Sequence, residues 1–145
     1  MVRVLIKKLD PAVVMPAYKT KGASGMDIMA FIEKPIRLVS KSSCLVPTGL
    51  SVAFSEEYEI QIRPRSGLAA KNNISVLNAP GTIDSDYRGE IKIILFNHGS
   101  SEFVINNKDR IAQIILSPVH KMSLEEVENL PNTLRGRGGF GSTGK

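Results

Sequence analysis

The chain between positions 58 and 63 reads Tyr58-Glu59-Ile60-Gln61-Ile62-Arg63, and its apolar and polar side chains alternate. A period of two sends successive side chains to opposite faces, which is typical of a half-buried β-strand. Similar alternation occurs over residues 2–6 and 91–96. Short apolar runs over residues 50–54, 74–77, 103–105 and 111–116, separated by glycine and proline, predict further strands.

Helical signals are few. Residues 66–71 fit about one and a half turns, and Ser123 with Glu126 has the form of a capping box that opens a short helix. Many short strands without helix-length crossovers favour an all-β barrel, sandwich or jelly roll over a βαβ architecture. The 145 residues fit one domain.

Composition excludes several classes of protein. One cysteine, Cys44, and two histidines, His98 and His120, exclude a disulfide scaffold and make a poor zinc set. The longest apolar run, residues 28–32, is far shorter than the ~20 residues that a membrane-spanning helix needs. The N-terminus returns to charge too early for an export signal, so a cytoplasmic location is expected. The net charge of +5 favours an anionic partner, which leaves nucleic acid, a nucleotide or a phosphate ester open.

The C-terminal segment 135–145 holds five glycines and no apolar period, so it predicts a mobile arm. Arg135, Ser142 and Thr143 suit phosphate oxygens, and Phe140 offers a ring for a base. A solvated basic tail, or an Arg-Gly stretch that binds RNA, is the alternative interpretation.

Other segments carry polar groups with a chemical use. Arg65, Ser66 and Gly67 follow a strand and form a candidate anion site, with a solvated surface turn as the alternative. Asp84 in the turn-rich stretch 78–90 is placed to orient and deprotonate water, with Tyr87 over the same pocket, although such stretches also form simple hairpin turns. Asp27 is either a buried structural acid or a group near a metal.

Five segments in this order resemble the five motifs of the trimeric all-β dUTPase family. They are Ser24-Gly25-Met26-Asp27, Pro64-Arg65-Ser66-Gly67-Leu68-Ala69, Asn78 through Glu90, Arg110-Ile111-Ala112-Gln113, and Arg135 through Gly144. Ser24, Met26, Ala79-Pro80 and Thr82 depart from the residues that the family often has, while Gly25, Asp27, Asn78, Asp84 and Tyr87 match the family.

The resemblance implies a jelly-roll-like β-barrel, of the β-clip kind, with one short helix. It implies a single domain over 1–145, with a β core over 1–134 and an arm over 135–145 that closes over an active site of a neighbouring subunit. The assembly would be a homotrimer with three sites at subunit interfaces, and without nucleic-acid or membrane partners.

The resemblance also implies the reaction, the hydrolysis of dUTP to dUMP and pyrophosphate, which supplies dUMP for thymidylate synthesis and keeps uracil out of DNA. Asp84 would activate the water that attacks the α-phosphorus. Mg²⁺ would be held mainly by substrate phosphates, with Asp27 contacting it through water.

The implied substrate contacts divide by the part of the nucleotide. The phosphates would be bound by Arg65, Ser66, Gly67, Gln113, Arg135, Gly141, Ser142 and Thr143. The base and sugar would be bound by Asn78, Gly81, Thr82, Ile83, Tyr87 and Phe140, with Lys92 as a further pocket contact. The alternatives are a dCTP deaminase of the same fold and a non-catalytic protein that senses nucleotides.

Overall fold

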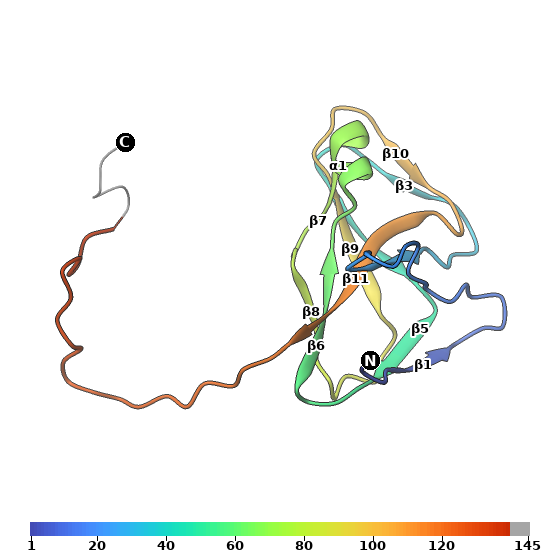
Figure 1. Ribbon diagram of the computed structural model, residues 1–145. Helices are drawn as coiled ribbons and strands as arrows, with labels where there is room; N and C mark the ends of the chain where they lie inside the picture. The colour runs from blue at the N-terminus through green and yellow to red at the C-terminus, as the bar shows by residue number, and fades with distance from the viewer. Residues whose placement is uncertain (140–145) are drawn as a thin grey trace.

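The computed structural model describes residues 1–139 and contains mainly short strands, with one helix (Figure 1). The elements are β1 (Leu5–Lys8), β2 (Met26–Met29), β3 (Ile36–Leu38), β4 (Ser43–Pro47), β5 (Leu50–Ala53), β6 (Tyr58–Arg63), α1 (Ser66–Asn72), β7 (Ile74–Val76), β8 (Gly81–Ile83), β9 (Lys92–Asn97), β10 (Phe103–Ile105) and β11 (Arg110–Pro118).

Within the described residues the strands form four antiparallel sheets. The largest has the order β2-β11-β6-β8, and the second has the order β4-β9-β7. β1 pairs with β5, and β10 pairs with β3. One apolar core lies between these sheets, and its most deeply buried side chains include Ile28, Leu38, Val46, Leu95 and Ile105. The predicted all-β fold is confirmed.

The alternating pattern predicted the central strand, because β6 spans the predicted residues 58–63, and the short apolar run predicted β10, which spans residues 103–105. The first helical signal is also confirmed, since α1 covers Ser66–Asn72. The helix expected at Ser123 is wrong, because residues 121–127 have no regular secondary structure. An isolated short helix is marginal in water, and Leu124 and Val127 are exposed here, so no packed face stabilises one.

After β11 the chain leaves the sheets. The backbone N–H of Val119 still donates to Glu57 O, and Lys121 pairs with Glu56. Beyond this point the segment runs away from the body in an extended path (Figure 1). Its apolar side chains are exposed, at 88% for Leu124 and 82% for Leu130. Among the described residues, the single helix is too short to cross a membrane.

Candidate active site

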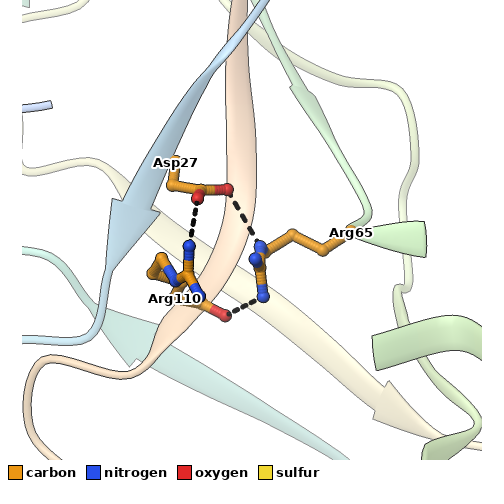
Figure 2. A network of polar contacts seen from close by, with 3 residues as sticks. All are labelled: Asp27, Arg65 and Arg110. Carbon is orange, nitrogen blue, oxygen red and sulfur yellow. Dashed lines mark hydrogen bonds and ion pairs between the residues drawn. The ribbon is translucent and has the colours of Figure 1, made fainter. Parts of the chain in front are cut away.

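Asp27 on β2 binds two arginines from distant parts of the chain (Figure 2). Its Oδ1 accepts from Arg65 Nε at 2.9 Å, and its Oδ2 accepts from Arg110 Nη1 at 3.2 Å. Arg65 also donates from Nη1 to the backbone oxygen of Arg110 at 3.3 Å. The Asp27 side chain is only 8% exposed, against 22% for Arg65 and 50% for Arg110. A buried carboxylate is therefore neutralised by two guanidinium groups that reach the surface.

A β-bulge brings Arg110 to this carboxylate. In the β11–β2 ladder Ala112 lies opposite Ile28, yet Arg110 lies opposite Met29, so Ile111 is an extra residue. Ile111 and Ala112 are consecutive and both are buried, which breaks the alternation of a regular strand. The extra residue returns Arg110 to the outer face of the sheet, the face that carries Asp27.

The neighbouring candidates lie on the same side of the molecule. Gln113 on β11 is the direct cross-strand partner of Asp27 on β2 and of Arg63 on β6. Arg65 stands at the N-cap position of α1 but makes no capping hydrogen bond with its side chain, which turns to Asp27 instead. Ser66 and Gly67 then form the first turn of α1. The structure thus brings Asp27 and Gln113 close to the start of α1.

A hollow of about 330 Å³ opens beside these arginines, and we call it the arginine hollow. Its lining residues are Arg65, Leu68, Phe103, Val104, Asp109, Arg110 and Ile111. Two guanidinium groups beside apolar lining side chains suit an anion that carries more than one negative charge.

A second hollow, of about 300 Å³, contains the other candidates, and we call it the Asp84 hollow. Asp84 follows β8 and is exposed, and it starts a turn in which the N–H of Tyr87 donates to Asp84 O. Thr82, Ile83 and Lys92 also line this hollow. The remaining lining residues are Leu45, Tyr87, Glu90, Ile91 and Ile94. The exposed carboxylate suits a water molecule, and the aromatic ring and apolar side chains beside it suit an organic ligand in the same hollow.

Two glycines shape this region. Tyr87 Oη donates to Glu90 O at 3.0 Å, and a Cβ on Gly89 would lie 2.3 Å from that same Tyr87 oxygen. The ring therefore occupies the space that a side chain at position 89 would need. Asn78 similarly packs over Gly81, where an added Cβ would lie 3.1 Å from Asn78 Nδ2.

Within one chain the two hollows are separate. Ile83 on β8 lies opposite Ile60 on β6 in an antiparallel ladder. Arg65 comes five residues after Ile60. Asp84 comes directly after Ile83, and because β8 runs antiparallel to β6, Asp84 lies beyond Ile60 on the side away from Arg65. At about 3.3 Å per residue, Asp84 and Arg65 are separated by roughly 20 Å of extended chain. The two hollows have no lining residue in common.

The remaining predicted residues belong to the C-terminal segment. Arg135 donates from Nε to Gly138 O at 2.9 Å, within the segment that runs away from the body. Phe140, Gly141, Ser142 and Thr143 lie outside the residues that the structure describes.

Arg110 is a further candidate, which pairs with Asp27 and lines the arginine hollow and which the sequence analysis placed in a motif without a role. The sequence carries no local signal for the bulge, because Ile114, Ile115 and Leu116 are also consecutive apolar residues and pair in a regular register.

The described residues do not form a metal cage. They contain no group of three or more histidine, cysteine, aspartate or glutamate side chains placed to hold an ion. Both Asp27 oxygens face guanidinium groups, which disfavours a cation beside them. A resident metal ion does not fit the side chains present, whereas an ion that arrives bound to a polyphosphate needs no such cage.

The chain is similar to known proteins in both sequence and fold. The dUTPase family model matches residues 12–144. Over 138 residues the chain is 54% identical to the Deoxyuridine 5'-triphosphate nucleotidohydrolase of Chlamydia pneumoniae, covering 94% of this chain and 95% of the relative. The protein of the same name from Treponema denticola is 50% identical over 137 residues, with the same coverage.

The fold also matches a solved structure. A mutant dUTPase of Staphylococcus bacteriophage 80alpha with dUpNHpp superposes with a TM-score of 0.87, at 23% identity and 99% coverage of both chains. At this identity the match shows a shared fold alone. The family model and the two bacterial relatives show similarity in sequence. The chain therefore belongs to the dUTPase family.

Proposed function

We propose that this chain hydrolyses dUTP to dUMP and pyrophosphate, with the magnesium complex of dUTP as the substrate. The observation that carries the proposal is the Asp84 hollow, in a chain at least 50% identical to two proteins named Deoxyuridine 5'-triphosphate nucleotidohydrolase. The reaction would supply dUMP for thymidylate synthesis and keep uracil out of DNA, in the cytoplasm.

Asp84 acts as the base in this proposal. Its exposed carboxylate accepts a proton from a water molecule as the water oxygen forms a bond to the α-phosphorus. The bond from that phosphorus to the bridging oxygen breaks, and the electron pair leaves with pyrophosphate. Displacement at phosphorus depends on alignment and on charge neutralisation, so one positioned base and several phosphate donors suffice.

Arg65 lines the arginine hollow, and the other phosphate donors lie on the adjoining start of α1 and on β11. Arg65 offers a planar fork, Ser66 a hydroxyl, Gln113 an amide, and Gly67 an unobstructed backbone N–H at the start of α1. From the arm, Arg135, Gly141, Ser142 and Thr143 are proposed to complete the contacts to the terminal phosphates.

The base and the sugar bind at the Asp84 hollow. Uracil pairs with the backbone of Gly81, Thr82 and Ile83 and with Asn78, because a fixed strand accepts one pattern of donors and acceptors and leaves cytosine unpaired. Tyr87 packs under deoxyribose, where a ribose 2′-hydroxyl collides with the ring that Gly89 lets lie close to the backbone. From the arm, Phe140 stacks on the base, and Lys92 contributes a contact at the rim.

The separation of the two hollows supports a site shared between subunits. Since Asp84 and Arg65 of one chain lie on the order of 20 Å apart along the ladder, we propose that the Asp84 hollow of one copy faces the arginine hollow of the next. A contact between two different faces builds a ring when its rotation closes, and we propose that it closes here as a homotrimer. The chain is proposed to be one domain, with a core over 1–134 and an arm over 135–145 that covers a site on a neighbour.

The test is pyrophosphate release from dUTP, dCTP, dTTP and UTP, with Mg²⁺ and with EDTA, on protein whose mass is measured by light scattering. The proposal predicts turnover of dUTP alone, loss of turnover in EDTA, and the mass of three chains. Ammonia release from dCTP would identify a deaminase of the same fold, and tight dUTP binding without turnover would identify a nucleotide sensor.

A further inference from the structure

The segment that carries Tyr87 is attached to the body of the molecule at the turn between β4 and β5. The hydroxyl of Thr48 in that turn donates to Ile91 O at 2.6 Å, and the N–H of Ile91 donates to Leu50 O at 2.8 Å. Thr48, Leu50 and Ile91 are each 1% exposed. The chain is therefore held firmly at position 91, directly after Glu90.

Glu90 adds a further link to the same turn through its side chain. Its Oε1 accepts the backbone N–H of Gly49 at 2.9 Å, and its Oε2 lies 3.7 Å from Lys92 Nζ. Gly49 is itself closely packed, since its φ is +67° and an added Cβ would lie 2.5 Å from Val13 Cγ2. Because both carboxylate oxygens have partners, Glu90 is placed to hold the chain and not to act as a second base beside Asp84.

The backbone of Glu90 holds the ring of Tyr87. Tyr87 Oη donates to Glu90 O at 3.0 Å, and the Tyr87 N–H donates to Asp84 O at 3.1 Å. Glu90 thus joins Tyr87, through its carbonyl, to Gly49, through its carboxylate. Asp84 is positioned differently, because it directly follows Ile83, which pairs within the sheet as the last residue of β8. A change at Glu90 should therefore move the ring of Tyr87 more than it moves Asp84.

We propose that Glu90 is a positioning residue for sugar selectivity, which holds Tyr87 under deoxyribose through its hydrogen bond to Gly49. This inference rests on the proposed function and deepens it, because it names a residue that sets the discrimination between dUTP and UTP by acting through Tyr87. A ring that shifts makes room for a ribose 2′-hydroxyl, so the selectivity depends on the contacts that fix the ring.

The experiment uses three substitutions that separate the reach of the Glu90 side chain from its charge. Glu90→Gln keeps the reach and an acceptor oxygen but loses the charge, Glu90→Asp keeps the charge but is one methylene shorter, and Glu90→Ala loses both. The matched control is Glu102→Ala, which removes a carboxylate of similar exposure, 31% against 22% for Glu90, from an ion pair with Arg37 outside both hollows.

Each full-length protein is assayed for kcat/KM with dUTP and with UTP. Calorimetry then compares the binding of dUpNHpp, a non-hydrolysable triphosphate analogue, with that of its ribose counterpart. Glu90→Asp and Glu90→Ala should lower the dUTP-to-UTP ratio of kcat/KM about tenfold, as expected for the loss of one hydrogen bond to a charged acceptor. The preference for dUpNHpp over its ribose counterpart should fall by a similar factor, while kcat for dUTP stays within about threefold of the wild-type value.

Glu90→Gln and Glu102→Ala should keep the wild-type ratio within about twofold, since the glutamine amide oxygen still accepts from Gly49. If Glu90→Ala does not fold, the contrast between Glu90→Asp and Glu90→Gln decides the question alone. A wild-type ratio in Glu90→Asp, or a loss in Glu90→Gln as large as in Glu90→Asp, would overturn the inference. A wild-type protein that fails to hydrolyse dUTP would instead refute the proposed function.

Discussion

Gly67 offers a test in which stability and activity move in opposite directions. It lies in the first turn of α1, its φ is not left-handed, and a Cβ built on it meets nothing within 4 Å. Neither packing nor backbone strain therefore requires glycine here. Alanine reduces the freedom of the unfolded chain and suits a helix, so Gly67→Ala should stabilise the fold by about 0.5–1 kcal/mol. For a chain of this size the melting temperature should rise by roughly 1–4 °C.

The same substitution should damage catalysis. Residues at the start of α1 have backbone N–H groups without partners inside the helix, and the proposed phosphates lie in the open space beside Gly67. A methyl group in that space displaces the phosphate from the N–H donors. Loss of one hydrogen bond to a charged group should lower kcat/KM for dUTP about 10- to 100-fold.

The assay pairs thermal unfolding with pyrophosphate release, at one protein concentration because oligomers melt in a concentration-dependent way. Gly22→Ala is the matched control, since a Cβ there also meets nothing within 4 Å and the residue lies outside the five motifs. It should gain similar stability and keep full activity. A Gly67→Ala protein with wild-type kcat/KM would refute the reasoning, because the empty space beside Gly67 would then have no ligand in it.

Four other substitutions or reagents test other parts of the molecule. Asp84→Asn should abolish measurable turnover while dUpNHpp still binds in calorimetry, because the base is lost and the pocket is kept. Gly89→Ala should displace the Tyr87 side chain, because the new Cβ would lie 2.3 Å from its hydroxyl oxygen and 2.5 Å from the nearest ring carbon, and should lower the ratio of dUTP to UTP activity at least tenfold in competition assays. Asp27→Asn should cost about 2–3 kcal/mol in urea unfolding, since two guanidinium groups lose a buried partner, and an unchanged midpoint would contradict the ion-pair geometry. Burial raises the pKa of the Cys44 thiol, so a disulfide reagent should label Cys44 slowly near neutral pH and faster as pH rises, whereas a rate equal to that of a free thiol would contradict its burial.

The strands with an alternating or apolar local pattern were predictable, and those without such a pattern were not. β6 and β10 have the predicted bounds because their side chains face a core on one side. The sequence analysis missed β3, which has three residues, and β4, whose Ser43-Cys44-Leu45-Val46-Pro47 has no clear period and ends in proline. Both are fixed by pairing with a distant partner, β10 and β9, which a local pattern does not reveal.

The candidate site was predictable as a set of segments and not as an arrangement. Motif order identified Asp27, Arg65 and Asp84. The ion pairs of Asp27 depend on the cross-strand register of β2, β11 and β6, and on a bulge that shifts this register by one residue. The distance between Arg65 and Asp84 depends on the antiparallel pairing of β6 with β8. Neither is encoded in the spacing of residues along the chain.

The separation of the two hollows has a consequence for inheritance. In the proposed ring a newly made chain carries two half-sites that mutate independently, and neither is complete without a neighbour. In a cell that expresses one allele defective at Asp84 and another defective at Arg65, mixed rings would join the intact half-site of each product. Two inactive alleles would thereby complement one another, although neither encodes a working enzyme.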